Sequence, residues 1–151
     1  MPDAPRIAHI GVAVPDLQSA LAFYRDGLGL PSHGITGAEF PGDDEHPAGA
    51  VAMFTLDDGL VLSLYPRAEL AKDAGVQASQ TAGSGVSIGH LVDSREDVDR
   101  ALELARRAGA RVTGPAHERP WGIYSGYFSD PDDHLWEIIY FPPRDGGDVS
   151  G

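Results

Sequence analysis

The sequence predicts an α+β fold made of two successive β-α-β-β-β repeats. Segments with strand alternation and segments with helical periodicity follow one another in the same order in both halves of the chain. His9 and His90 lie 81 positions apart, and the same offset relates Asp16 to Asp97 and the apolar residues that follow them. The length of 151 residues, 42% of them apolar, is sufficient for the core of one ordinary domain.

Composition excludes several classes of partner. The net charge of −12 argues against nucleic acids and anionic membranes. No apolar run approaches the roughly 20 residues of a membrane helix, and the N-terminus lacks a signal-peptide pattern, so we expect a cytoplasmic protein. Because cysteine is absent, any bound metal must take histidine and carboxylate ligands.

The first repeat is expected to span residues 6–74. Residues 7–14 alternate as a strand, with larger apolar side chains on one face and small ones plus a histidine on the other. Asp16 then caps a helix with apolar residues at helical spacing. Residues 50–55 and 60–65 form a hairpin around an Asp-Asp-Gly turn.

The second repeat is expected to span residues 86–142, after a flexible connector at 75–85 that is rich in Gly, Ser, Ala and Gln. It opens with a strand containing a histidine, and Ser94 then caps a helix that Gly109 closes. Residues 143–151 are expected to form a flexible tail.

The last hairpin contains a polar residue where an apolar one is expected. Glu137 lies inside the strand Leu135–Tyr140, where even a neutral polar group without a partner costs on the order of 2–7 kcal/mol. A metal ion is one candidate for its partner. Trp136 alternates with Glu137 and is expected in the core, whereas His134, in the preceding turn, is expected to be solvated.

Aligning the two repeats brings four positions into equivalence: His9, Ser63, His90 and Glu137. Two histidines and one carboxylate form the facial triad of non-haem iron sites, which also suits manganese, zinc or nickel. The alternative is a hydrogen-bonded His–Glu cluster without an ion. Ser63 is too weak a base to act as a fourth ligand, so we expect three protein ligands and open positions for substrate or water.

Two segments carry a family resemblance over residues 6–142. Residues 7–17 read Ile-Ala-His-Ile-Gly-Val-Ala-Val-Pro-Asp-Leu, and residues 22–30 read Ala-Phe-Tyr-Arg-Asp-Gly-Leu-Gly-Leu. Residues 126–137 resemble a closing motif Gly-Tyr-Phe-x-Asp-Pro-Asp-Gly-His-x-x-Glu. Together they resemble the vicinal oxygen chelate superfamily, which includes glyoxalase I, bleomycin-resistance proteins, fosfomycin-resistance enzymes and extradiol dioxygenases.

The resemblance implies paired repeats forming a half-open mixed β-barrel, the glyoxalase/bleomycin resistance/dioxygenase fold, which is often dimeric and holds a metal that chelates substrate oxygens. The family's ligand positions match His9, His90 and Glu137. Ser63 departs from the Glu of glyoxalase I and from the Gln of methylmalonyl-CoA epimerase, another member of the superfamily, so both activities are disfavoured. Tyr127 precedes Glu137 by ten positions, as a tyrosine does in the dioxygenase motif.

These observations predict a divalent-metal-dependent enzyme, dioxygenase- or glyoxalase-like, acting on a small oxygen-chelating substrate. Tyr127 is the candidate acid or hydrogen-bond donor, or else a wall of the pocket. Trp121 and Tyr124, with Ser63, are the candidate pocket residues, although aromatic packing is an equal alternative for the first two. The competing class is a metal-free protein that sequesters a cationic small molecule, as the acidic charge allows.

Overall fold

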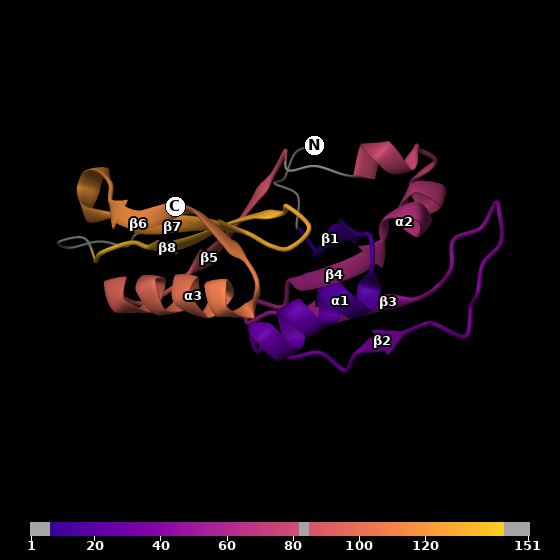
Figure 1. Cartoon of the computed structure of the whole chain (residues 1–151), viewed down its shortest axis with the longest axis horizontal. Coiled ribbons are helices and arrows are strands. Elements are labelled where there is room, and N and C mark those ends of the chain that lie inside the picture. Colours follow the sequence, from indigo (N-terminus) through magenta and orange to yellow (C-terminus); the bar gives the residue numbers. More distant parts are fainter. Residues whose placement is uncertain (1–6, 82–84, 144–151) are drawn as a thin grey trace, which may run out of the picture. The chain divides into compact units, whose positions relative to one another are not determined.

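The chain contains two four-stranded sheets, with strand orders β1-β4-β3-β2 and β5-β8-β7-β6, and helices that accompany each sheet (Figure 1). The computed structural model describes residues 7–81 and 85–143. Contacts divide the chain into two units, Met1–Gly83 and Ser84–Gly151, and each unit contains one of the sheets. The predicted flexible tail falls almost wholly outside the described residues.

The first unit follows the predicted β-α-β-β-β order. β1 pairs with β4 in parallel, and β3 pairs antiparallel with β4 and β2. As predicted, Asp16 caps α1: its Oδ1 accepts from the amides of Gln18 and Ser19, at 3.0 and 3.2 Å. The elements are β1 (His9–Val14), α1 (Leu17–Leu21), the π-helical turn η1 (Ala22–Gly27), β2 (Ile35–Thr36), β3 (Val51–Thr55), β4 (Val61–Pro66), α2 (Arg67–Ala74) and the 3-10 turn η2 (Ala78–Thr81).

The core of the first unit lies between its sheet and the helical segment α1–η1. Val12 and Leu64, which are opposite each other in register, are buried on this face, as is Phe54 of β3. Tyr24 of η1 reaches Phe54, with ring centroids 6.1 Å apart. Alternation therefore leaves the other face of this sheet for the side chains of His9 and Ser63.

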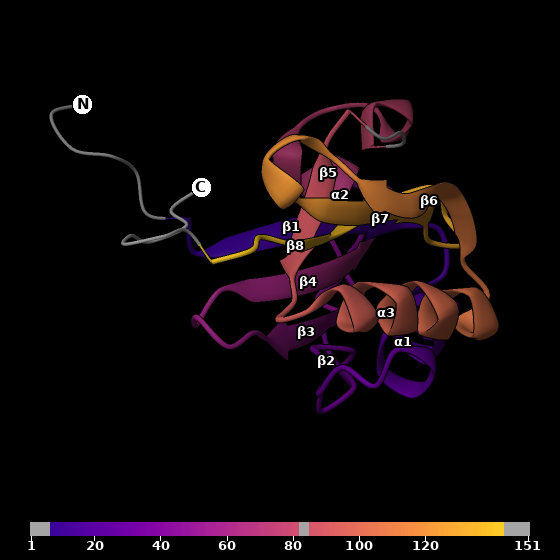
Figure 2. The same ribbon diagram turned by 90° about the vertical axis from the view of Figure 1, so that its left-hand side faces the viewer.

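The second unit repeats this order with a longer helix. Ser94 caps that helix by accepting from the Asp97 amide at 3.1 Å, as predicted. Figure 2 shows α3 running along one face of the sheet, where its Val98 and Leu102 are buried. The elements are β5 (Ser87–Leu91), α3 (Arg95–Ala108), β6 (Arg111–Glu118), the 3-10 turn η3 (Pro120–Gly122), β7 (Tyr124–Ser129) and β8 (Leu135–Tyr140).

The sheet face under α3 contains Phe128, Trp136 and Ile138, all buried. The rings of Phe128 and Trp136 are stacked, with centroids 6.1 Å apart. The α+β class, the paired repeats and the core position of Trp136 are therefore confirmed. The short strand β2 was not predicted from the sequence.

The equivalence between the two repeats differs from the predicted one by three residues. The helix caps Asp16 and Ser94 are 78 positions apart, not 81. The strands agree, because His9 pairs with Val61 where Ser87 pairs with Leu135. Ser87, not His90, is thus the counterpart of His9. A shift of three residues is almost one helical turn, so helix periodicity hardly detects it, whereas in a strand an odd shift moves every side chain to the other face.

His134 is also placed differently from the prediction. Its Nδ1 lies 2.8 Å from Asp130 Oδ2, and its side chain is only 16% exposed. The buried Asp130 also accepts from the amides of Asp132 and His134, so this histidine belongs to the turn structure and is not solvated.

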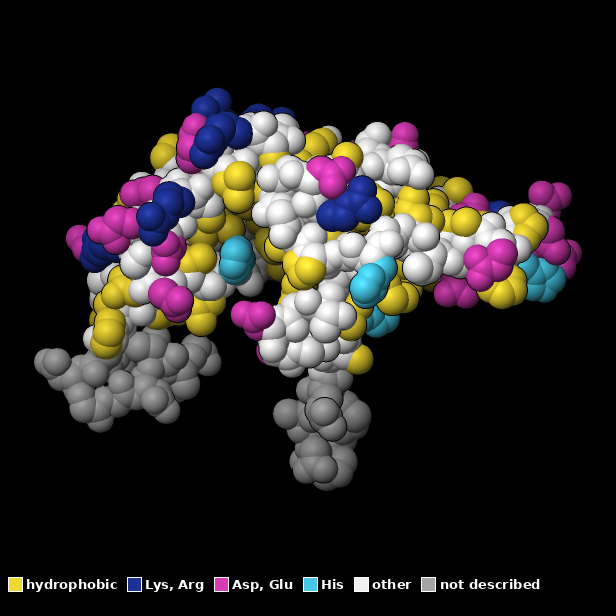
Figure 3. Space-filling model, turned by 90° about the horizontal axis from the view of Figure 1, so that it is seen from below, with side chains coloured by type: hydrophobic (Ala, Val, Ile, Leu, Met, Phe, Trp, Pro, Cys, Tyr) yellow, Lys and Arg dark blue, Asp and Glu magenta, His cyan; other side chains and the backbone are white. Residues whose placement is uncertain are grey.

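Charged side chains are spread over the surface (Figure 3). Figure 3 shows carboxylates scattered over the face drawn, several of them beside basic side chains. Among the helices described for residues 7–81 and 85–143, none has the length and apolar character needed to cross a bilayer.

Candidate small-molecule site

The open face of the first sheet brings His9 close to Tyr65. A Cβ placed on Gly11 would lie 3.5 Å from the Tyr65 ring and 3.8 Å from His9 Nε2, so both side chains converge over this glycine. Ser63 is opposite Gly11 in register and is 1% exposed. Met53, opposite Ser63 on β3, is 48% exposed on the same face. The face thus combines an imidazole, a phenol and a buried hydroxyl with an exposed thioether.

The open face of the second sheet centres on Glu137. In register, Glu137 lies between Gly89 of β5 and Tyr127 of β7. Gly89 has no side chain, and a Cβ built on it meets no atom within 4 Å, so the space beside the carboxylate on that side is open within the described structure. The carboxylate therefore has a phenol on one side and free space on the other.

Tyr127 is held in its protonated form. Burial raises its pKa above the ordinary value, and the nearby charge of Glu137 raises it further, while Arg119 opposes the shift. At neutral pH the phenol is therefore protonated, and it does not act as a base. The donor role of Tyr127 stays a prediction.

His90 does not share the face of Glu137. It pairs in register with Ile138, whose side chain is buried on the α3 face, whereas Glu137 pairs with Gly89. Partial burial of the imidazole lowers the pKa of His90 below its ordinary value, so the ring is neutral at neutral pH. The prediction that these two side chains converge is wrong, because it rested on the 81-residue offset.

The residues present do not fit the predicted His-His-Glu metal centre. The position on β5 that faces the same way as Glu137 belongs to Ser87, and the equivalent position on β4 belongs to Ser63. Neutral hydroxyls are weak ligands compared with imidazole or carboxylate. Within the described residues of each unit, no three His, Asp or Glu side chains gather as a metal ion requires. His9 belongs to the other unit, so its pairing with Glu137 stays a prediction.

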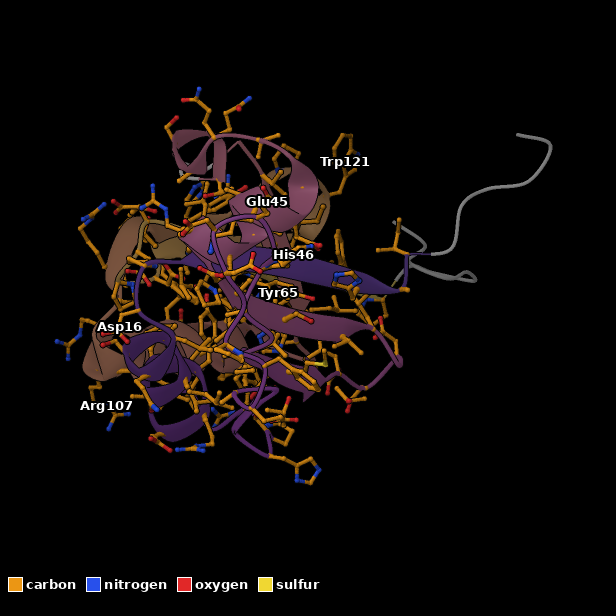
Figure 4. All side chains as sticks on the ribbon, turned by 90° about the vertical axis from the view of Figure 1, so that its right-hand side faces the viewer. Asp16, Glu45, His46, Tyr65, Arg107 and Trp121 are labelled. Atoms are coloured by element: carbon orange, nitrogen blue, oxygen red, sulfur yellow. The ribbon has the colours of Figure 1, made fainter. Side chains whose placement is uncertain are left out.

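The predicted pocket aromatics lie elsewhere. Tyr124 donates to Asp99 Oδ1 of α3 at 2.8 Å, and its ring lies 5.3 Å from the Arg95 guanidinium carbon, so it belongs to the helix side of the sheet. Trp121 is 88% exposed and projects away from the ribbon in Figure 4. Its φ of 64° is in the left-handed region, which is unusual for a bulky residue.

Arg119 is a residue of this face that was not predicted from the sequence. Its Nε donates to Ser125 Oγ at 2.5 Å, and its guanidinium carbon lies 5.8 Å from the centre of the Tyr127 ring. Ser125 and Tyr127 are two positions apart on β7, so both contacts are on the face of Glu137. Arg119 follows a strand with irregular register, where alternation in the sequence gives no guide to side-chain direction.

Comparison with known proteins identifies relatives. The chain is 34% identical over 129 residues to a Cereibacter sphaeroides protein named ethylmalonyl-CoA/methylmalonyl-CoA epimerase, an alignment that covers 76% of this chain and 84% of the relative. A crystal structure of a glyoxalase-related enzyme from Fulvimarina pelagi superposes with a TM-score of 0.75 at 26% identity, covering 98% of this chain and 99% of that one.

A lactoylglutathione lyase from Agrobacterium tumefaciens has the same fold, with a TM-score of 0.64 at 23% identity over 91% of this chain and 95% of that one. The sequence profile of one family matches residues 6–138, most of the chain. The chain therefore belongs to the Glyoxalase/Bleomycin resistance protein/Dioxygenase superfamily.

Proposed function

We propose that this protein binds a small organic molecule through the open face around Glu137 and does so without a His-His-Glu metal centre. The observation that carries the proposal is the register of β5, which presents Gly89 and Ser87 beside Glu137 and turns His90 to the other face. The ligand meets a carboxylate and a phenol, both suited to hydrogen bonding, in place of a metal ion.

The chemistry of the face favours a ligand with a cationic or hydroxyl donor group. Among the residues described, no lysine or arginine forms an ion pair with Glu137. An ionised carboxylate without a basic partner attracts a ligand donor strongly once water is displaced. The net charge of −12 also raises the local concentration of cations, which further favours a cationic ligand.

Metal analysis of protein purified without an affinity tag tests the metal-free part of the proposal. We expect substoichiometric zinc, manganese, iron and nickel in the wild type, and no change in His90→Ala. Ser87→His is the gain-of-function control, because it places an imidazole on the face of Glu137. Stoichiometric metal that is lost in both His90→Ala and Glu137→Ala would overturn the proposal and restore the three-ligand prediction.

A thermal-shift screen tests the binding part. Planar and aliphatic amines, alcohols and zwitterions are the compounds to screen, with chelator present throughout. A ligand should raise the melting temperature of the wild type and leave Glu137→Ala unchanged, because the carboxylate is its anchor. Ligands that stabilise both proteins equally would place binding elsewhere.

A second candidate is an enzyme acting on an acyl-CoA substrate, favoured by the relative named as an epimerase. Ser63 weighs against it, because the family resemblance implies a glutamine at this position in the epimerase. Incubation with racemic and single-isomer methylmalonyl-CoA, with and without added divalent metal, decides between the two. A homodimer and a cytoplasmic location remain predictions; sedimentation velocity tests the first.

A further inference from the structure

We propose that Arg119 is an anion-binding residue on the open face of the second unit, where it recognises a carboxylate or phosphate group of the ligand. The inference deepens the proposed ligand-binding function and rests on it. A ligand that engages both Arg119 and Glu137 then carries an anionic group and a donor group.

The guanidinium is held by contacts that leave part of it available. Nε donates to Ser125 Oγ at 2.5 Å, and Ser125 is fully buried at 0% exposure. The Tyr127 ring lies under the group at 5.8 Å. The Arg119 amide also donates to the Ile123 carbonyl at 2.7 Å, which closes the turn that carries the side chain. Anchoring through Nε fixes the plane of the guanidinium and orders its terminal amino groups before a ligand arrives.

Among the arginines of the described residues, Arg119 and Arg67 lack the carboxylate partner that the others have. Arginines 25, 95, 100, 106, 107 and 111 each lie within ion-pair distance of an aspartate or glutamate. In the described part of the chain, no carboxylate lies within that distance of Arg119, and no residue accepts from its terminal amino groups. Arg119 is thus a half-buried positive charge without a carboxylate partner, in a protein whose net charge is −12.

The available edge of a guanidinium suits an oxyanion. Two parallel N–H donors match the two oxygens of a carboxylate or phosphate, and the pair is charge-assisted. Tyr127 lies between this edge and Glu137, since its ring contacts Arg119 and it is opposite Glu137 in register. The Tyr127 ring therefore has a positively charged guanidinium on one side and a carboxylate on the other. This arrangement fits a zwitterionic ligand, such as the phosphate ester of an amino alcohol.

Nitrogen-15 NMR of the arginine Nε–Hε signals tests the inference, with malonate and inorganic phosphate as probes at constant ionic strength. We expect saturable shifts of the Arg119 signal, and the tighter of the two probes identifies the anion class. In Arg119→Gln, the dissociation constant from backbone amide shifts in the β6–β7 turn should rise by about tenfold or more. Arg119→Lys keeps the positive charge but lacks the two parallel N–H donors, so its dissociation constant should lie between those of the wild type and Arg119→Gln. Arg111→Gln, which removes an exposed arginine of the same unit, should leave the constant unchanged.

Equal binding in wild type and Arg119→Gln, or shifts shared by all arginine signals, would overturn the inference. The screen for organic ligands separates this result from failure of the proposed function. An organic ligand that needs Glu137 but binds Arg119→Gln equally well would leave the proposed function standing alone. Anion binding at Arg119, together with a screen that finds no organic ligand, would support the inference about Arg119 and contradict the proposed function.

Discussion

At the scale of single residues, Tyr127 lies between groups of opposite charge. Glu137 raises its pKa and Arg119 lowers it, on top of the rise caused by burial. Because the folded-state pKa is raised, the stability that the protonated phenol contributes is complete below the ordinary pKa of about 10 and is lost as pH rises through the folded value.

Substitutions on either side of Tyr127 should therefore move its pKa in opposite directions. Glu137→Gln should lower the pKa of Tyr127, and Arg119→Gln should raise it. Tyrosinate absorbance during alkaline titration, with Tyr127→Phe to assign the signal, measures both. Tyr124 is the internal control, since its pKa is raised mainly by its hydrogen bond to Asp99 on the other face. An unchanged Tyr127 titration in Glu137→Gln would contradict the described contact.

The sequence identifies some residues of this face and not others. Glu137 is visible because a carboxylate interrupts an apolar strand, and Tyr127 because its position ten residues before Glu137 resembles the dioxygenase motif. Arg119 follows two shifts of register in β6, and a register shift leaves no trace in alternation. The 81-residue offset between His9 and His90 places His90 on the face of Glu137, whereas the strand register places it on the opposite face.

At the scale of elements, the sequence specifies the ends and buried faces of helices better than it specifies which residues of two strands pair. The caps, the hairpins and the buried face of α3 could all be predicted, since capping residues and periodicity are local signals. The pairing of β5 with β8 could not, because register depends on contacts between strands that are distant in sequence.

Close packing of α3 on the sheet gives a test of this element. A Cβ at Gly126 would lie 2.6 Å from Leu102 Cδ1 and 2.9 Å from both Ala116 N and Gly114 O, and the two backbone atoms cannot easily move. Gly126→Ala should therefore lower the free energy of unfolding by about 1–3 kcal/mol. Urea denaturation measures the change.

Gly89→Ala is the matched control in the same sheet, because a Cβ there meets no atom within 4 Å. Its effect on the free energy of unfolding should stay within about 0.5 kcal/mol. A Gly126→Ala protein as stable as this control would show that both α3 and the backbone of β6 can move away from β7 at little cost.

At the scale of the whole molecule, acidic residues set the response to pH. Hydrogen bonds and nearby cations lower the pKa values of Asp43, Glu69, Asp97 and Glu103. A carboxyl group with a depressed folded-state pKa stabilises the fold above its unfolded pKa, and that contribution is lost as pH falls through the folded value.

The melting temperature should therefore be highest near neutral pH and fall below about pH 4 in moderate salt. Glu69 is the residue to change, since it accepts from the Ala48 amide at 2.7 Å and from Lys72 Nζ at 3.1 Å. Glu69→Gln should lower the melting temperature at pH 7 and reduce its decline in acid, whereas Glu39→Gln at an exposed position should do neither. Parallel acid limbs for wild type and Glu69→Gln would contradict this account.

The contrast between the two tryptophans has a spectroscopic consequence. Trp136 is 7% exposed and stacks on Phe128 in the core of the second unit, whereas Trp121 is 88% exposed at the turn beside Arg119. Indole emission shifts to longer wavelength in water, and collisional quenchers reach only accessible rings. Acrylamide should therefore quench Trp121 selectively and leave a blue-shifted component from Trp136. The second unit thus carries two tryptophan fluorophores, one reporting on its core and the other on the exposed turn next to Arg119.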